Sequence, residues 1–447
     1  MRRSRFQLFL HTLMDCLSDS QLLVAMALVT GLITGVAAYM LKRLVAYIST
    51  SLVMNLDPWG ANWMFLIFPV AGILLTGIYQ RYVLRQKIYH GVSQLGMAIA
   101  ERRYRLPGYL TYAPIVASSL TLGFGGSAGA EGPIAYAGAA IGSNVARSLG
   151  VRPDLMRFML ACGASAGIAA IFKAPVGGAF FSLEVLSVSL SVMAVLAVFI
   201  ASLTAWFTAY ALSGCTTDVA FEQYTAVTPD IWPYILLLGM FCGIYSFYYS
   251  RVMHHMVKFY FRMENPWMKN LLSGSVVAVC VFLFPALWGE GYGFIAKVLA
   301  GHGEAITSYS LWATRLPSPR LLILMAAGML LVKPLATSST NSGGGVAGDF
   351  APTIFAGCIA GYFFALTANT FLRLNLPVVD FAFFGMAAVM AGAIQAPLMA
   401  IFLVVEMVSH YSLLLPVTVA ATISYVIVKA LGKVADIHWF YRHHSST

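Results

Sequence analysis

Apolar runs recur along nearly the whole 447-residue chain and constrain its fold more than any other feature. A helix that spans a bilayer needs about 20 mainly apolar residues, and some of these runs are shorter while others are longer. The pattern predicts an all-α polytopic membrane protein in which tilted and partial-depth helices accompany full spans. The runs cover residues 22–40, 64–79, 159–171, 176–212, 234–249, 321–332, 381–407 and 413–430.

Charged residues are scarce and lie near the ends of these runs. They make up only 10% of the chain, against about 25% in soluble domains, so a water-soluble globule would lack polar surface. The net charge of +10 could attract nucleic acid, but basic residues such as Lys42, Arg43 and Arg102 flank apolar runs. We interpret them as membrane anchors and expect no nucleic-acid partner. Both termini are basic, which predicts that both are cytoplasmic.

Two glycine-rich segments of the chain match each other. Five positions of residues 129–142 reappear in residues 348–361 at a spacing of 219 (348 − 129), and four positions of residues 163–184 reappear in residues 385–406 at a spacing of 222 (397 − 175). Two similar halves are typical of transporter folds; from the sequence they can be parallel or inverted. The predicted parts are an N-terminal segment (1–20), a first membrane repeat (21–216), a linker (217–231), a second membrane repeat (232–432) and a C-terminal tail (433–447).

Pro133 and Pro352 lie at matching places after glycines and predict two helix starts inside the membrane. Proline is favoured at the first helical position because the amide it lacks would have no partner there. A helix N-terminus offers free amide donors and about half a positive charge. A buried lysine would hold an anion too tightly for fast passage, whereas partial charges bind it and let it leave. Close helix packing explains a single copy, but two matching copies favour a shared anion site.

Glu131 lies at the first of these helix starts. A carboxylate inside the membrane costs several kcal/mol unless it is stabilised or protonated. The amides that bind an anion can also hold this carboxylate, so Glu131 can occupy the anion's place, be displaced by the anion, or leave on protonation. These properties predict a gate that also carries protons; the alternative is a helix cap that only satisfies free amides.

The segment Gly129–Pro133 resembles the Gly-Xaa-Glu-Gly-Pro motif of the CLC family of chloride channels and proton-coupled chloride antiporters. Gly348–Pro352 resembles the family's Gly-Xaa-Phe-Xaa-Pro motif, and residues 172–185 are similar to the stretch that enters its dimer-interface helices. The resemblance implies a homodimer with one pore per subunit and two halves of inverted topology. It implies an integral protein of the prokaryotic inner membrane that moves chloride or a similar monovalent anion, with no cofactor or metal and no enzymatic activity.

The resemblance also assigns the site, with Glu131 as the gate. His90 takes the place of a central serine of the first family motif, or else is an interfacial histidine. His438 and Tyr441 are candidates for the family's pore tyrosine, or else interfacial aromatics. The predicted anion-binding residues are Gly129, Gly132, Ile134, Gly348, Phe350, Ala351, His90, His438 and Tyr441.

Val185 occupies a position at which proton-coupled members often carry an inner glutamate. This departure favours a passive chloride channel, whereas the short chain without regulatory domains favours proton-coupled exchange, which we take as the leading prediction. A fluoride-selective exchanger is a second alternative, because the first motif is altered at His90. The neighbouring Glu184, and Glu406 in the second half, are predicted to be structural, hydrogen-bonded carboxylates.

Overall fold

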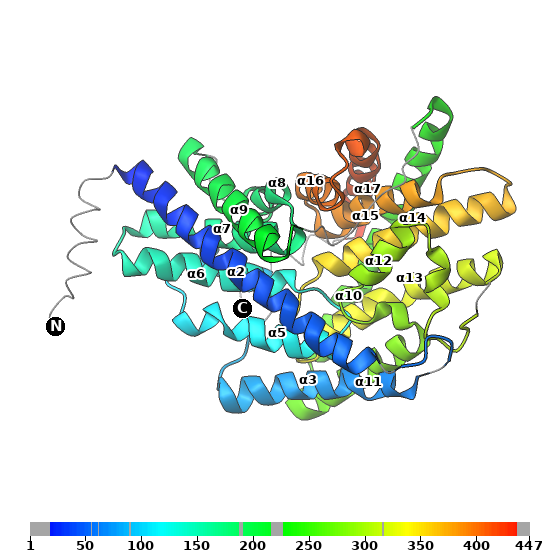
Figure 1. Cartoon of the computed structure of the whole chain (residues 1–447), viewed down its shortest axis with the longest axis horizontal. Coiled ribbons are helices and arrows are strands. Elements are labelled where there is room, and N and C mark those ends of the chain that lie inside the picture. The colour runs from blue at the N-terminus through cyan, green and yellow to red at the C-terminus, as the bar shows by residue number, and fades with distance from the viewer. Residues whose placement is uncertain are drawn as a thin grey trace.

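The computed structural model describes residues 18–54, 56–60, 62–88, 91–186, 191–215, 227–314 and 317–435. In these ranges the regular structure is helical, with one isolated bridge between Gly129 and Gly348. The predicted all-α class is therefore confirmed. Figure 1 shows the helices packed side by side, with the long α2 running obliquely across the first half of the chain.

The helices divide at the predicted linker. Those of the first half are α2 (Asp19–Val53), α3 (Phe68–Ile78), α4 (Gly91–Ala100), α5 (Ala113–Gly123), α6 (Glu131–Ser148), α7 (Pro153–Phe172), α8 (Pro175–Phe180) with the π turn η4 (Phe181–Val185), and α9 (Val192–Leu212). Those of the second half are α10 (Trp232–Phe261), α11 (Pro266–Leu283), α12 (Tyr292–Leu299), α13 (Pro319–Ser342), α14 (Phe350–Phe371), α15 (Val378–Ile394), α16 (Pro397–Val408) and α17 (Leu414–Ala435).

Two helices extend past the predicted boundaries of the membrane repeats. The helix α2 begins at Asp19, inside the predicted segment 1–20, because Ser18 caps it: the Ser18 hydroxyl accepts from the Gln21 amide and the Gln21 side chain accepts from the Ser18 amide. At the other end α17 continues to Ala435, beyond the predicted boundary at 432. Part of the predicted linker, residues 217–226, lies outside the described residues.

The described helices have the lengths that a bilayer requires. Nine of them are long and apolar enough to cross a membrane, while α5, α15 and α16 are apolar but shorter. The 35 residues of α2 extend about 50 Å, which exceeds the roughly 30 Å hydrocarbon core. Large apolar side chains such as Leu32, Phe207 and Leu324 are more than half exposed. The protein is therefore an integral membrane protein with lipid-facing apolar side chains.

The sequence repeat is visible in how the helices pack. In the first half α6 lies against α7, and a Cβ added at Gly138 would overlap the Gly163 carbonyl oxygen. In the second half α14 lies against α15, and a Cβ added at Gly357 would overlap the Gly385 carbonyl oxygen. These two pairs are the ones that the sequence repeat matches. Small residues let membrane helices approach closely, so the same contact is built twice.

A reciprocal pair of carboxylates joins the two halves. The Glu184 carboxylate accepts from the Met399 amide at 2.8 Å and from the Leu398 amide at 3.4 Å, at the start of α16. The Glu406 carboxylate accepts from the Gly177 amide at 2.8 Å, in the first turn of α8. Each acid satisfies amides that a helix start leaves without an intrahelical partner. The prediction that both are structural, hydrogen-bonded carboxylates is confirmed.

We expect Gly163→Ala to destabilise the protein by about 1–3 kcal/mol, the usual cost of overpacking, because its Cβ would meet the Gly138 carbonyl. Gly96→Ala in α4 is the matched control, since a Cβ there meets nothing within 4 Å. Thermal unfolding in detergent measures the difference. A Gly163→Ala variant that unfolds at the temperature of Gly96→Ala would contradict the close packing of α6 on α7.

Candidate anion site and its gate

The two predicted motifs meet at the start of α6 and α14. The Gly129 amide donates to the Gly348 carbonyl at 3.0 Å, and the Gly348 amide donates to the Gly129 carbonyl at 2.6 Å. These residues are equivalent positions of the two repeats. The bridge brings together two helix N-termini that are 219 residues apart in the chain.

The Glu131 side chain crosses from α6 to the N-terminus of α14. Its Oε1 atom accepts from the Phe350 amide at 2.5 Å and from the Ala351 amide at 3.1 Å. The side chain is buried, so these charge-assisted bonds form away from water, where such bonds are strong. An acid from one repeat therefore occupies the N-terminal helix end of the other repeat.

The pocket around the carboxylate depends on glycine. A Cβ at Gly348 would lie 2.7 Å from Glu131 Oε1, and a Cβ at Gly129 would overlap the same carboxylate. At Gly132 a Cβ would lie 3.1 Å from the Gly348 Cα atom. All three glycines were predicted as anion-binding residues. Gly129 and Gly348 lie against the Glu131 carboxylate, and Gly132 lies against the backbone of Gly348.

Two local predictions about this site are wrong. The helices begin at Glu131 and Phe350, two residues before the prolines, because the third amide of a helix also lacks an intrahelical acceptor and proline costs no bond there. The Ile134 amide was expected to hold an anion, but it donates to the Ala130 carbonyl at 3.1 Å. It is therefore engaged within its own helix.

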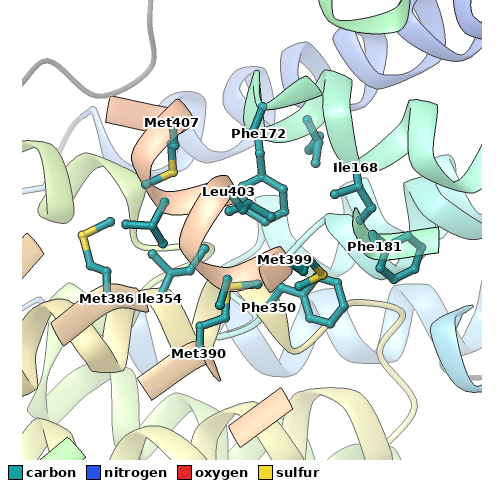
Figure 2. Packing of buried hydrophobic residues seen from close by; sticks show 14 of the residues in the cluster. Ile168, Phe172, Phe181, Phe350, Ile354, Met386, Met390, Met399, Leu403 and Met407 are labelled. Carbon is teal, nitrogen blue, oxygen red and sulfur yellow. The ribbon is translucent and has the colours of Figure 1, made fainter. Parts of the chain in front are cut away.

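An apolar shell surrounds the side chain of Phe350. Its ring meets the ring of Phe181 edge to face, with centroids 5.7 Å apart. Figure 2 shows Phe350 and Phe181 beside Met399 and the side chains of α15 and α16. Only the backbone amide of Phe350 is thus directed at the carboxylate, while its side chain excludes water from one side of the site.

A basic cavity lies close to the gate. It has a volume of about 590 Å³, and Glu290 in its wall accepts from the Ala130 amide at 3.0 Å, next to Glu131. The basic residues that line the cavity are Lys42, Arg43, Lys173 and Lys297. Positive walls concentrate anions, so this cavity is suited to deliver an anion to the start of α6. The sequence analysis missed Glu290, which follows Trp288 and Gly289 in a loop and belongs to no motif.

Lys333 is a second charged residue that the sequence analysis missed. It lies in α13, its side chain is 1% exposed, and its Nζ atom donates to the Ser127 hydroxyl at 2.9 Å. We expected partial charges alone in this region, and the structure adds a buried basic side chain. A lysine at the end of the apolar run 321–332 was the available signal, because an ionisable residue inside the membrane is by default a functional candidate.

Three predicted residues, His90, His438 and Tyr441, lie outside the described residues. Val185 ends the π turn η4 and is partly buried against the apolar core. In the part of the chain that the structure describes, no group of three or more His, Cys, Asp or Glu side chains could hold a metal ion.

The fold and the site together define a class of protein: a polytopic membrane transport protein with a buried acid between two helix N-termini. The chain belongs to the voltage-gated chloride channel family, whose pattern matches residues 71–429. This match confirms the resemblance to the CLC family that the motifs indicated.

Named relatives and a solved structure agree with this family. A protein of Ralstonia nicotianae described as ClcB-like is 28% identical over 84% of this chain and 84% of its own length. The H(+)/Cl(−) exchange transporter ClcA of Vibrio cholerae serotype O1 is 29% identical over 70% of this chain and 64% of its own length. The crystal structure of a slow cyanobacterial Cl−/H+ antiporter superposes with a TM-score of 0.77 at 21% identity, over 96% of this chain and all of that one. The last similarity supports the fold.

We expect chloride to raise the unfolding temperature of Glu131→Ala more steeply than that of the wild type. The substitution removes the acceptor for the Phe350 and Ala351 amides, so an anion can fill the place, and a ligand that binds only the folded state stabilises it. Thermal unfolding at increasing chloride, with gluconate as the control anion, measures this. Equal chloride dependence in the two proteins would show that Glu131 and chloride do not compete.

Proposed function

We propose that this protein exchanges chloride or a similar monovalent anion for protons, with Glu131 as the gate. The observation that carries the proposal is the buried Glu131 carboxylate on the amides of Phe350 and Ala351. That place suits an anion, because it combines a helix N-terminus with backbone donors. The name of the Vibrio cholerae relative, an H(+)/Cl(−) exchange transporter, supports the same activity.

The proposed mechanism uses two states of Glu131. As a carboxylate it occupies the amides of α14 and blocks the site. When it takes up a proton it loses its charge, its bonds to the amides weaken, and an anion takes its place. When the anion leaves, the side chain gives up the proton and returns. The movement of a proton and the movement of an anion then depend on one side chain, which links the two fluxes.

Backbone amides explain how the anion is released again. The Phe350 and Ala351 amides carry partial charges, so they bind an anion without a covalent or fully ionic contact. The apolar rings of Phe350 and Phe181 exclude water on one side. A dehydrated anion is thus held by few donors and can exchange with the basic cavity beside Glu290.

Passive chloride conduction is the second candidate, and Val185 is the observation that favours it. A valine at this position cannot pass a proton, and its neighbour Glu184 is engaged with the start of α16. In a passive channel, Glu131 would still gate the anion but would not link it to proton movement.

We also propose a homodimer in the prokaryotic inner membrane with cytoplasmic termini and no enzymatic activity. Exposed apolar residues on α9, α16 and α17, such as Val192, Leu398 and Leu415, support a subunit contact on that side. The helices α8 and α16 pack there, with the rings of Phe180 and Phe402 stacked at 5.0 Å. The termini themselves lie outside the described residues.

We expect Glu131→Gln to retain chloride flux and to lose proton coupling. Glutamine mimics the protonated acid but cannot release a proton, so the gate stays in its neutral state. Proteoliposomes with a chloride gradient, read by a chloride electrode and a pH electrode together, measure both fluxes.

Wild-type vesicles should move protons against their gradient while chloride runs down, and Glu131→Gln vesicles should show chloride flux that no longer varies with pH. Glu184→Gln is the matched control, because it alters an acid of the fold away from the gate. Proton coupling that survives in Glu131→Gln would contradict the gate assignment, and wild-type chloride flux without proton movement would favour the passive channel.

A further inference from the structure

Lys333 is a buried basic residue inside the membrane domain, and the mechanism above does not use it. It lies in the middle of α13 (Pro319–Ser342) with 1% of its side chain exposed. A charged side chain is costly to bury at the centre of a membrane. A lysine in such a place needs either neutralisation or a partner of opposite charge.

The ammonium group contacts both segments that build the gate. Lys333 Nζ donates to the Ser127 hydroxyl at 2.9 Å, four residues before Glu131. It also lies 4.7 Å from the centre of the Phe355 ring, in the second turn of α14. Ser127 and Phe355 are both buried. The cation is therefore held between the loop that carries Glu131 and the helix whose amides bind it.

A second bond fixes the loop before Glu131 to α13, the helix that carries Lys333. The Ser127 amide donates to the Thr340 hydroxyl at 3.1 Å, and Thr340 lies seven residues after Lys333 in α13. The loop before Glu131 is thus attached to α13 through both the side chain and the backbone of Ser127. Because α13 sets the position of this loop, the distance between Lys333 and Glu131 is fixed by the fold.

The backbone around Lys333 is also supported by a neighbouring helix. Pro334 has no amide hydrogen, so the Leu330 carbonyl loses its helical donor. The Tyr245 hydroxyl of α10 donates to that carbonyl at 2.9 Å, and the Tyr248 hydroxyl donates to the Leu331 carbonyl at 2.8 Å. The turn that carries Lys333 is therefore held in place by two hydroxyl groups of α10.

The Lys333 amino group, at the Ser127 hydroxyl and over the Phe355 ring, lies in the same buried interior as the segments that hold the Glu131 carboxylate. A low dielectric makes an interaction between charges stronger than in water. An anion that replaces the Glu131 carboxylate on the amides of α14 would experience the same positive charge.

We propose that Lys333 is a positioning residue that supplies the positive charge for whichever anion, the Glu131 carboxylate or chloride, occupies the amides of Phe350 and Ala351. The inference rests on the proposed function and deepens it. The charge strengthens anion binding and also opposes protonation of the gate. Lys333 thus sets both the affinity for chloride and the pH at which the gate opens.

Other titratable groups reach the same interior from the surrounding elements. Glu290 interacts with Glu131 from the loop before α12, and Cys280 interacts with Lys333 from α11. Tyr249 of α10 interacts with Glu131 and with Asp349, the residue before α14. Of the described groups named here, Lys333 is the one cation. Its removal takes one positive charge out of the interior between the loop before Glu131 and α14, so the direction of the effect is defined.

The test measures chloride uptake into proteoliposomes as a function of chloride and of pH. For Lys333→Met we expect the chloride KM, taken at a pH low enough to protonate Glu131, to rise about tenfold. The maximum rate should not fall, because a weaker site releases the anion sooner. The pH of half-maximal transport should rise by about one unit, since Glu131 without its positive neighbour keeps its proton to higher pH.

Three further variants test the charge of Lys333, the sign of the electrostatic effect and the bond to Ser127. Lys333→Arg keeps the charge and should stay within about twofold of the wild-type KM. Glu290→Gln keeps an acceptor for the Ala130 amide but removes a negative charge beside Glu131, so its pH of half-maximal transport should fall. Ser127→Ala removes only the bond to Lys333 and should raise the KM about threefold. This variant replaces Lys333→Met in the test if Lys333→Met does not fold.

A wild-type KM and a wild-type pH midpoint in folded Lys333→Met would overturn the inference, and so would an unchanged KM in Ser127→Ala. Glu131→Gln in the same assay separates the two proposals. If its flux remains pH-dependent, the proposed function fails. If its flux is independent of pH while Lys333→Met matches the wild type, only the role of Lys333 fails.

Discussion

The structure depends on one interaction: the Glu131 carboxylate accepts from the amides that begin α14. A helix N-terminus buried in a membrane has donors that must find an acceptor. A carboxylate buried in a membrane must find donors. Each group satisfies the other, so the closed site is stable without water. In the proposed mechanism an anion makes the same bonds to the amides after Glu131 has taken up a proton, so the amides are not left without an acceptor.

The duplicated packing places these two groups together. Glycine pairs bring α6 onto α7 and α14 onto α15 in the same way, and the Gly129–Gly348 bridge joins the two helix starts. The reciprocal bonds of Glu184 and Glu406 tie the halves together on a second side. The site therefore lies where two equivalent elements meet, which is where transporter folds with internal repeats bind their substrates.

The sequence predicted those parts that a short segment or a repeat determines. Glu131, its glycines and the equivalent segment Gly348–Pro352 could be found because one motif and its copy define them. Lys333 and Glu290 could not be placed in this way, since their contacts with Ser127 and Ala130 join residues 206 and 160 positions apart. The expectation that only partial charges bind the anion also excluded a lysine in an apolar helix from the predicted site. Sequence patterns locate the amides, and tertiary packing decides which charges surround them.

The most direct test is to locate the anion in the Glu131→Gln protein. Crystals grown in bromide, with anomalous scattering recorded at the bromine absorption edge, report its position. The account predicts a bromide peak within hydrogen-bonding distance of the Phe350 and Ala351 amides, in the place that Glu131 Oε1 occupies in the wild-type structure. An ordered Glu131→Gln structure with no bromide at those amides would contradict it.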